Sequence, residues 1–589
     1  MCDLGVMFRK TEPQQELFKV DAGLPESLQK RLRGTWASVF QREILPVLMD
    51  CEEQFAILYG AKGRPNFSTG RMLGLCLLQE FNNLSDQAAL DAFGFDVRWQ
   101  YALDVTPEKA YLSRRSLVEF RSRLVQHDPE MLLMRNVFEK VSKAAILKLE
   151  LSVSEQRLDS TQITSNISRR GRLDLFRKTL TVFLRSLDEE RFALVPADIQ
   201  KWFHDVENSS GWFGLEPAAH QAKLVELARC IHRLLSIFKE DEVTSGSEPY
   251  QLLKRLFDEH CETKGSSNQS PTDTDNSQDK RCDRTDNRTD DTTDDIIVKK
   301  GSEGASLQSP YDPDASCGHK GPGYSVHVSE TCNNKNKPEI ITDYEVHGAA
   351  RSDVAKTPDI LRRLEAAELK PDTMFADGGY PTPPSTLDII ANGVELIAPV
   401  HRGKLAPEIM SRSDFSFDAQ GQITACPAGH APLDHRERSA QNTTEKAIHA
   451  IFDGDQCRHC EMLEKCPVRA PNNRKKGCSQ RDTKGNFRLE VPESLVTRDR
   501  MFALQQTPEW KERYKIRSGV EATMSELKRC HGLAKLRVRR LPRVQFAVIC
   551  KVTACNIRRW AAFAMLFCLI YTFCGWSGFP HQQHANASA

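Results

Sequence analysis

The sequence predicts an α/β protein in which a mixed β-sheet with flanking helices follows an all-helical N-terminal region and is interrupted twice. Three observations lead to this fold class. Residues 1–150 carry helical periodicity, short β-like runs alternate with helical segments from residue 156 onward, and two long stretches of different composition separate these runs. The 589 residues exceed the roughly 250–300 that one hydrophobic core supports, so we expect several folded units.

The composition excludes wholesale disorder, because 40% of the residues are hydrophobic and 27% are charged, as in ordinary globular proteins. The net charge of +1 does not by itself indicate a nucleic-acid partner. The charge is nevertheless unevenly distributed: residues 263–295 hold nine Asp, whereas residues 511–543 hold eleven Lys or Arg against three Glu. A local basic patch of this kind is typical of DNA-binding surfaces, since neutralising phosphates releases counterions.

The N-terminal region is expected to be helical, because polar capping residues precede apolar residues at helical spacing. Ser68 or Thr69 can cap one helix and Ser85 the next, and Ser113 precedes a further apolar stripe. We therefore interpret residues 1–150 as an N-terminal helical domain.

The order of the β-like runs from residue 156 predicts the topology. Strands are expected at 157–163, 324–330, 339–346, 373–376 and 394–399, and helices at 352–369, 384–392 and 508–530. With the two interruptions removed, the order is β-β-β-α-β-α-β-α, which is that of the ribonuclease H fold. The predicted units are 1–150, 151–171 (first strand), 172–262 (helical insertion), 263–310 (acidic Ser/Thr/Asp-rich linker), 311–402 (sheet continued), 403–500 (Cys-rich insertion), 501–560 (C-terminal helices) and 561–589 (apolar helix and tail).

Three acidic side chains fall at positions that this topology brings together. Asp159 lies within the first predicted strand, and Asp377 follows an apolar strand in the segment MFADGGY. In a ribonuclease H order these two strands are neighbours at the centre of the sheet, and the 508–530 helix that carries Glu521 packs across them. The three carboxylates are then expected to converge.

The helix at 508–530 presents one polar stripe. Tyr514, Arg517, Glu521 and Lys528 stand at offsets 0, 3, 7 and 14, which places them within roughly 60° on an ideal helix. Apolar residues fall on the other side, namely Ile516, Val520, Met524 and Leu527. For an isolated helix, the simpler interpretation is a solvated face tied by an Arg517–Glu521 pair. The upstream acids favour a shared site instead.

Converging carboxylates are costly without cations, and hard oxygen ligands suit Mg²⁺ or Mn²⁺. Two such ions would support an in-line phosphoryl displacement on DNA. Arg517 and Lys528 can hold phosphates, and Tyr514 can stack on a base or donate to a phosphate.

The string Y-x2-R-x3-E-x6-K formed by Tyr514, Arg517, Glu521 and Lys528 resembles the signature of DDE transposases from a large group of bacterial cut-and-paste insertion sequences. Further blocks resemble the same family, namely LDSTQITSNISRRGRL, FADGGY, SPYDPDASCGHKGPGYSVHVSET and the N-terminal GRPNFSTGRMLGLCLLQEFNNLSDQAA. The similarity touches most of residues 30–560, and it implies that residues 1–150 form an N-terminal helical DNA-binding domain.

This resemblance implies that Asp159 contacts both metal ions, that Asp377 completes one site and Glu521 the other, and that Tyr514, Arg517 and Lys528 grip the DNA end. It also implies double-stranded DNA substrates, both transposon ends and target, and a homodimer or higher synaptic assembly. The relatives suggest a DNA hairpin, which leaves the hairpin and direct-transfer pathways both open. The expected location is the bacterial cytoplasm, at the nucleoid when the protein is bound to DNA.

The cysteines indicate a second metal. The N-terminus lacks the apolar segment of a signal peptide, so the 18 Cys are expected in a reducing compartment. Cys457, Cys460 and Cys466 form C-x2-C-x5-C, and Cys426 lies upstream in CPAGH, a set that fits a closed structural Zn²⁺ site. His430 or His459 could replace one cysteine, and reduced buried cysteines are the alternative.

The remaining candidates have simpler interpretations. Cys76, Cys550 and Cys555 and four of the tryptophans (Trp99, Trp202, Trp212 and Trp560) are expected in the core. His347 lies close after the third predicted strand; a structural or solvent-facing position is expected, with a role near the metal ions as the alternative. The apolar run 561–576 falls short of the ~18–20 residues of a membrane span, so a docked helix is favoured over an anchor.

Two other functions compete with the transposase. A catalytically silent, transposase-derived DNA-binding protein would keep the fold and the charge, but the presence of all three acids argues against it. A ribonuclease H-like nuclease would share the acids but would not need the stripe from Tyr514 to Lys528.

Overall fold

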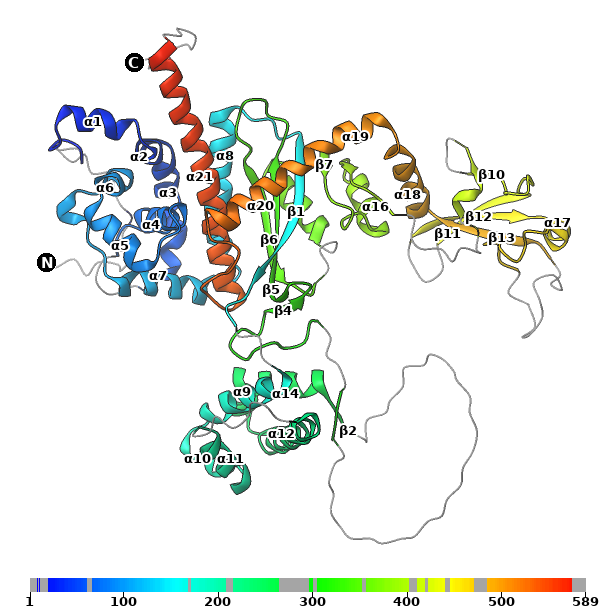
Figure 1. The fold of residues 1–589 in the computed structure, drawn as a ribbon, viewed down its shortest axis with the longest axis horizontal. Helices are drawn as coiled ribbons and strands as arrows, with labels where there is room; N and C mark the ends of the chain where they lie inside the picture. The colour runs from blue at the N-terminus through cyan, green and yellow to red at the C-terminus, as the bar shows by residue number, and fades with distance from the viewer. Residues whose placement is uncertain are drawn as a thin grey trace.

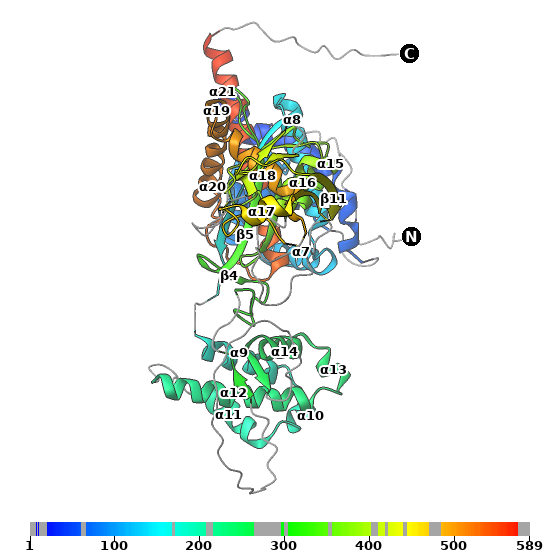
Figure 2. The same cartoon turned by 90° about the vertical axis from the view of Figure 1, so that its right-hand side faces the viewer.

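The computed structural model describes residues 8, 10, 20–60, 66–167, 171–207, 216–263, 296–299, 304–351, 356–401, 410, 412–418, 422–439, 445–470 and 485–574. A central sheet has the N-terminal helices on one side and a small cysteine-containing unit at the far end of the other side, while a helical lobe hangs below the sheet (Figure 1). Figure 2 shows the lobe below the sheet, and an ion pair between Arg540 and Glu248 of the lobe at 2.8 Å joins the lobe to the rest of the described chain.

The N-terminal region is helical, and its caps are the ones that the sequence predicts. Ser68, Ser85 and Ser113 each accept a hydrogen bond from a backbone N–H in the first turn of the helix that follows, which satisfies a donor that would otherwise have no partner. The helices are α1 (Glu26–Arg33), α2 (Trp36–Val39), α3 (Leu45–Asp50), α4 (Thr69–Phe81), α5 (Asp86–Phe95), α6 (Val97–Leu103), α7 (Arg114–His127) and α8 (Leu132–Leu149). They share one hydrophobic core with the central sheet.

The central sheet is mixed. Its strands are β1 (Glu155–Thr164), β4 (Ser316–Gly318), β5 (Gly321–Thr331), β6 (Ile341–Gly348), β7 (Thr373–Phe375) and β8 (Glu395–Ile397). They are ordered β4-β5-β1-β7-β8, with β6 also paired to β5. β1 pairs antiparallel with β5, and β5 with β6, whereas β7 runs parallel to both β1 and β8. The five strands expected from the sequence all form, and β4 is an additional one.

Helices connect the parallel strands as the sequence predicts. α15 (Thr357–Ala366) leads into β7, and α16 (Pro383–Ala391) joins β7 to β8. The expected start of the first helix at residue 352 lies outside the described residues, because the structure describes that helix only from Thr357. Crossovers of this kind are what parallel pairing requires.

The helix expected over 508–530 forms as a continuous helical segment, but a 3₁₀ turn divides it into two α-helices. The segment forms α19 (Pro508–Tyr514), a 3₁₀ turn at Lys515–Ser518 and α20 (Gly519–Arg529). The physical reason is Arg157 of β1, whose Nη1 donates to the Ile516 carbonyl at 3.0 Å. A Cβ at Gly519 would lie 2.0 Å from the same guanidinium nitrogen, so only glycine allows this approach.

The last helix, α21 (Leu541–Cys574), packs against α4, α8 and β6 and links the N-terminal helices to the sheet (Figure 1). Cys550, Cys555 and Trp560 are buried in it, as expected, and so are Cys76 and Trp99 in the N-terminal helices. The predicted apolar segment continues α21 as far as Cys574, and residues 575–589 lie outside the described part. Across the described ranges, no helix combines the length and the apolar character needed to cross a membrane.

The helical lobe lies between β1 and β4 in the chain and has its own hydrophobic core. It comprises α9 (Arg172–Arg185), α10 (Glu189–Ala193), α11 (Ala197–Glu207), α12 (Pro217–Ile237), α13 (Glu242–Ser245), α14 (Glu248–His260) and a pair of short strands, β2 (Cys261–Thr263) and β3 (Ile296–Val298). Trp202 is partly buried against this core, while Trp212 is outside the described residues. Most of the predicted acidic linker, residues 264–295 and 300–303, also lies outside them.

The cysteine-containing unit is a small antiparallel assembly that follows β8. It contains β9 (Ser416–Phe417), β10 (Ile423–Ala425), β11 (Asp434–Ser439), β12 (Lys446–Phe452), α17 (Gly454–His459) and β13 (Phe487–Pro492). α18 (Glu493–Leu504) runs from it back toward α16 and α19 (Figure 1). Its core consists of nine buried hydrophobic residues, against which three of the cysteines pack.

Candidate active site

Asp159 and Asp377 stand at the same level of the sheet. The parallel register pairs Arg157 with Phe375, so the positions two residues further along each chain, Asp159 and Asp377, lie beside each other where β7 ends. Asp159 is 9% exposed, and its Oδ1 accepts a hydrogen bond from the Ser160 N–H at 2.8 Å. Burial raises the pKa of this carboxyl, and Asp377 adds to the rise, whereas Arg517 opposes it.

The turn after β7 fixes Asp377. Its Oδ1 accepts from the Gly379 N–H at 2.8 Å, and its carbonyl accepts from the Tyr380 N–H at 3.2 Å. Gly378 is close-packed, because a Cβ there would lie 3.2 Å from both the His401 ring and the Pro399 carbonyl. The DGGY sequence thus forms a tight turn that holds the carboxylate at the strand end.

Arg517 brings the three predicted acids together. Its Nη2 lies 2.9 Å from Asp159 Oδ2 and 3.8 Å from Asp377 Oδ2, and its Nη1 lies 3.2 Å from Glu521 Oε1. One guanidinium therefore touches carboxylates from β1, from the turn after β7 and from the first turn of α20. The side chain of Glu521 is 68% exposed and that of Asp159 is 12% exposed, so the cluster opens to solvent on the α20 side.

The cluster requires positive charge and has the ligand chemistry of a hard divalent cation. Three carboxylates in a partly buried site repel one another unless a cation compensates them, and here Arg517 provides that compensation. All three side chains offer oxygen ligands of the kind that Mg²⁺ and Mn²⁺ prefer. The donor set fits such ions, and the assigned metal-binding roles stay predictions.

A different trio forms the tightest group of ligand atoms. Within the described ranges, the group of three His, Cys, Asp or Glu whose ligand atoms lie within 4.8 Å of one another consists of Glu526, His531 and Cys555. This is a candidate metal site formed by α20, by the residues just after it and by α21. The Glu526 carboxylate is already bound by the Arg559 guanidinium at 2.9 Å, so its charge is compensated without a metal ion.

Tyr514 and Lys528, the other two members of the predicted stripe, also lie near the acids. The Tyr514 hydroxyl donates to the Ala376 carbonyl at 3.3 Å, and its ring stacks on Trp510 with the centroids 4.7 Å apart. Burial lowers the pKa of Lys528, Lys320 lowers it further, and Asp159 opposes the change, which places Lys528 within electrostatic range of the site. The 3₁₀ turn therefore leaves all four residues of the stripe on the side of the acids.

A buried network behind the acids was not identified from the sequence. Glu330 of β5 is completely buried and accepts from Arg157 Nε at 2.7 Å, from Arg559 Nη1 at 3.0 Å and from the Thr523 hydroxyl at 2.6 Å. Through these bonds β1, β5, α20 and α21 share one anion. The sequence signal was a Glu in an otherwise apolar and small-residue strand, which periodicity alone does not distinguish from a solvated position.

His347 is also buried, so of the two expected positions, structural and solvent-facing, it occupies the structural one. Its Nε2 is 2.8 Å from His327 Nε2, and His327 Nδ1 is 2.8 Å from the Tyr380 hydroxyl. His347 is 2% exposed and His327 is fully buried. These hydrogen bonds connect β6 and β5 to the turn that carries Asp377, and they help to hold that turn in place.

The four predicted cysteine ligands line one small cavity. Cys426, Cys457, Cys460 and Cys466 surround a space of about 20 Å³ together with His430 and apolar side chains. Burial raises the pKa of Cys457 to about 12, and the three other cysteines add to the rise. The backbone N–H of His430 donates to Cys426 Sγ at 3.3 Å. His459 is not part of the lining, and its Nδ1 donates to the Asp455 carbonyl at 2.8 Å.

Comparison with known families supports a DDE transposase family. A family model described as "Transposase DDE domain" matches residues 425–561, and a second, described as "Transposase domain (DUF772)", matches residues 35–123. The first match includes Glu521 and the four cysteines, and the second covers the helices from α2 to most of α7. No curated protein and no solved structure matches the chain.

Proposed function

We propose that this chain is a DNA transposase that cuts DNA at the inverted-repeat ends of its own element and joins those ends to target DNA. The observation that carries the proposal is the single Arg517 guanidinium in contact with Asp159, Asp377 and Glu521. These residues come from three distant segments of the chain. Their meeting at one open-sided site is the arrangement that the DDE resemblance implies.

The sheet topology supports a ribonuclease H-like catalytic core. Of the strands expected from the sequence, the first three form an antiparallel unit with β5 between β6 and β1, and the last two, β7 and β8, extend it in parallel from β1. Helix α20 contacts β1, the strand that carries Asp159. We propose that the helical lobe and the cysteine-containing unit are insertions into this core, with the eight units bounded as the sequence predicts.

Asp159, Asp377 and Glu521 would hold two divalent ions, Mg²⁺ or Mn²⁺, with Asp159 shared between them. When bound, such ions activate a water or a DNA 3′-hydroxyl and stabilise the leaving oxygen in an in-line displacement. The residues of the chain hold the carboxylates in place: the Gly379 N–H orients Asp377, and the Ser160 N–H orients Asp159.

Arg517 and Lys528 would contact phosphates on either side of the cut bond. Arg517 presents a fork of N–H groups suited to phosphate oxygens, and Lys528 adds a point charge near Asp159. Tyr514 stacks on Trp510, so these two rings together offer an aromatic platform next to Asp377.

The four cysteines would hold a structural Zn²⁺. Cys-x2-Cys spacing presents two thiolates to one ion, and Cys426 and Cys466 line the same cavity. Four protein ligands leave no position for substrate, so the proposed role is to stabilise the cysteine-containing unit. We further propose that the protein acts as a homodimer or a higher synaptic assembly, since two DNA ends must be cut and joined together.

The test uses the full chain and a DNA fragment that contains this reading frame with its flanks. We expect Mg²⁺-dependent cuts at short inverted repeats, and we expect Asp159→Asn to lower the cutting rate at least about a thousand-fold while DNA binding is retained, because removal of even one electrostatic stabiliser costs about 10²–10³. Equal behaviour of the two proteins would contradict the proposal and favour a silent DNA-binding protein. Cleavage of RNA in an RNA–DNA hybrid, with none of DNA, would favour a nuclease.

A further inference from the structure

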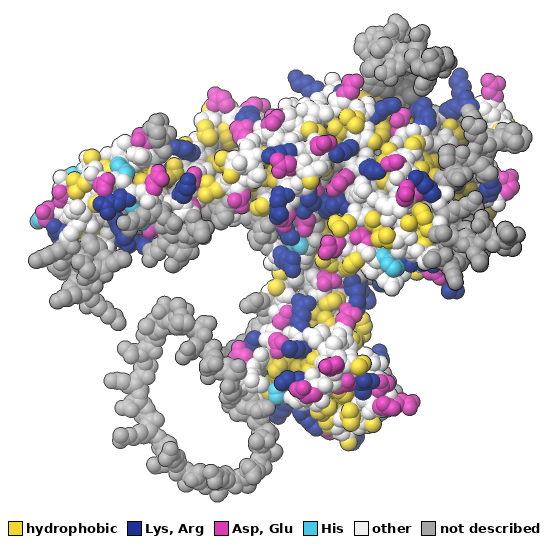
Figure 3. Space-filling view, turned by 180° about the vertical axis from the view of Figure 1, so that it is seen from behind, with side chains coloured by type: hydrophobic (Ala, Val, Ile, Leu, Met, Phe, Trp, Pro, Cys, Tyr) yellow, Lys and Arg dark blue, Asp and Glu magenta, His cyan; other side chains and the backbone are white. Residues whose placement is uncertain are grey.

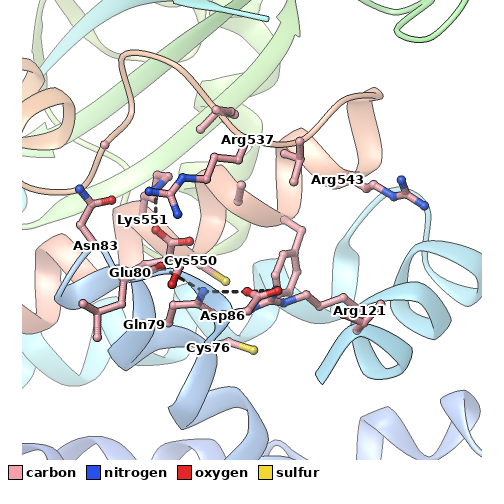
Figure 4. A pocket seen from close by; sticks show the side chains of 18 of the residues that line it. Cys76, Gln79, Glu80, Asn83, Asp86, Arg121, Arg537, Arg543, Cys550 and Lys551 are labelled. Carbon is pink, nitrogen blue, oxygen red and sulfur yellow. Dashed lines mark hydrogen bonds and ion pairs between the residues drawn. The ribbon is translucent and has the colours of Figure 1, made fainter. Parts of the chain in front are cut away.

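A groove lies between the N-terminal helices and the segment that follows α20. Its walls are α4, α5 and α7 on one side and residues 532–551 on the other, and its volume is about 750 Å³ (Figure 4). We call it the interlobe groove; neither of its walls belongs to the helical lobe described above. It is separate from the acidic cluster, since none of Asp159, Asp377 or Glu521 lines it.

The groove is strongly basic. Six Lys or Arg line it against two acids, Glu80 and Asp86. Both acids are already bound: Lys551 pairs with Glu80, and Arg121 pairs with Asp86 at 2.8 Å. Figure 4 shows both pairs: Arg121 and Asp86 lie on the wall formed by the N-terminal helices, whereas Lys551 and Glu80 join the two walls.

The other four cations are available to a ligand. Arg114, Lys535, Arg537 and Arg543 are all exposed. Over the residues that the structure describes, Lys535, Arg537 and Arg543 form no ion pair, and Arg114 adds only a longer-range attraction to Asp86. Positive charge is thus concentrated in the groove, whereas the rear face of the molecule shows Lys and Arg scattered among Asp and Glu (Figure 3).

Apolar side chains complete the lining. Val118 and Leu84 lie on the wall of the N-terminal helices, and Leu536 and Phe546 on the opposite wall. A basic surface with apolar patches matches a phosphodiester chain, whose phosphates bind cations while its sugars contact apolar groups. Such a surface does not read a base sequence, because Arg and Lys on phosphates carry no direct sequence information.

The groove is connected to the strand that carries Asp159. The Thr164 N–H of β1 donates to the Ala534 carbonyl at 3.1 Å, and Thr164 is paired with Lys535 of the groove. Thr164 lies five positions after Asp159 along β1, which corresponds to a distance of roughly 16 Å. Duplex DNA advances about 3.4 Å per base pair, so this span is about five base pairs.

We propose that the interlobe groove binds the phosphodiester backbone of the DNA whose end lies at the acids, about five base pairs from the cut bond. This inference rests on the proposed function, because it takes DNA as the ligand. The groove thereby gives α7 and the segment after α20 a shared role, which is to fix the DNA axis relative to the acids.

The test compares binding of a DNA duplex from the element's end by two double variants, in Ca²⁺ so that no cutting is required. Arg537→Gln/Arg543→Gln removes two groove charges, and Lys201→Gln/Arg229→Gln removes two exposed charges from the helical lobe as a matched control. Each phosphate contact contributes about 0.9 to the slope of log affinity against log salt. We expect the groove variant to lose about 1.8 from that slope and at least about ten-fold in affinity at 0.15 M salt, with an unchanged melting temperature.

Interference mapping adds the position. Ethylation of phosphates about five base pairs from the cut should weaken binding by the wild type and have no effect on the groove variant. A groove variant that matches the control in affinity and slope would overturn the inference, whatever the outcome of the cleavage test. Tighter binding of an RNA duplex than of the DNA duplex by the wild type would overturn the assignment to DNA. Failure of cleavage alone, with the binding results intact, would contradict the proposed function and leave this groove a DNA-binding surface.

Discussion

The acidic cluster and the cysteine cluster gather potential metal ligands in opposite ways. The carboxylates surround a cation of the protein itself, because Arg517 touches all three. Among the residues that the structure describes, the cavity between the four cysteines is lined by thiols, by His430 and by apolar side chains, without Lys or Arg. Burial raises the pKa of Cys457 and Cys466, so these thiols stay protonated unless a metal ion replaces their protons.

The scaffolds of the two clusters differ as well. Asp159 and α20 are attached to the large core shared by the sheet and the N-terminal helices, whereas three of the four cysteines pack on a core with nine buried hydrophobic residues in the described part of the chain. A core this small contributes little stability by itself. From this difference we expect a metal ion at the acids to serve chemistry and a metal ion at the cysteines to serve folding.

The largest expected effect therefore concerns zinc. Structural zinc contributes about 10 kcal/mol or more to the folding of small domains, so Cys457→Ser or chelation should unfold the cysteine-containing unit. Limited proteolysis should then cut within 410–490 while the rest of the chain stays intact, and the bound zinc should fall from one ion per chain to none. Cys317→Ser, at an exposed cysteine outside the cavity, is the control. A metal-free protein that is equally resistant to protease would show that reduced cysteines suffice.

The second effect concerns Glu330, which compensates two arginines behind the acids. Glu330→Gln leaves both guanidinium groups buried without their shared anion, which should destabilise the fold by about 3–5 kcal/mol. Thermal unfolding measures this loss. Glu119→Gln, which removes one partner of an exposed pair with Arg115, should cost less than about 1 kcal/mol. A small effect at Glu330 would mean that Arg157 and Arg559 do not hold α20 in place.

The Glu330 network is also an example of a feature that the sequence alone does not predict. Periodicity predicted the helix caps at Ser68, Ser85 and Ser113 and the strand order, because capping and alternation are local properties. The contact of Arg157 with Ile516, which breaks the predicted helix, joins residues 359 apart in the chain. The same holds for the Glu330 network, and no local pattern records such a pairing.

The acid cluster itself was partly predictable. The spacing from Tyr514 to Lys528 and the turn at DGGY pointed to the three acids, but not to Arg517 as the group that touches all of them. That position follows from the 3₁₀ turn at Lys515–Ser518, which the helical periodicity did not predict. A helical wheel assumes an unbroken helix and therefore gives the face but not the contacts.

The third prediction concerns the stability of the helical lobe, which contains neither the acidic cluster nor the cysteine cluster. Burial, together with the nearby charge of Arg172, lowers the pKa of His260 in α14 to about 4. The unfolded chain binds a proton near pH 6.5 and the folded lobe only near pH 4, so stability is fully present above pH 6.5 and is lost as the pH falls toward 4. The loss is at most about 3 kcal/mol. His260→Leu should flatten the pH dependence of lobe unfolding, and an unchanged pH dependence would show that another group is responsible.

The smallest expected effect is on the rate of DNA cutting when Arg517 is replaced, which tests whether this arginine is needed at the acidic cluster. Arg517→Lys keeps the charge but loses the planar fork that reaches three carboxylates, so the rate of DNA cutting should fall about 10–100-fold. The matched control is Arg513→Lys on the same segment, where an exposed pair with Glu395 is altered and the cutting rate should hardly change. Equal rates for both variants would mean that the fork is not needed at the acids.

The central claim, that Asp159, Asp377 and Glu521 share divalent metal ions, is tested most directly by locating the metal on the chain. Fe²⁺ with ascorbate and peroxide cuts a polypeptide next to the bound ion. The account predicts cuts beside β1, beside the turn at Asp377 and at the start of α20, all suppressed by excess Mg²⁺ and all lost in Asp159→Asn. Cuts confined to other segments, such as the region of Glu526, His531 and Cys555, would contradict it.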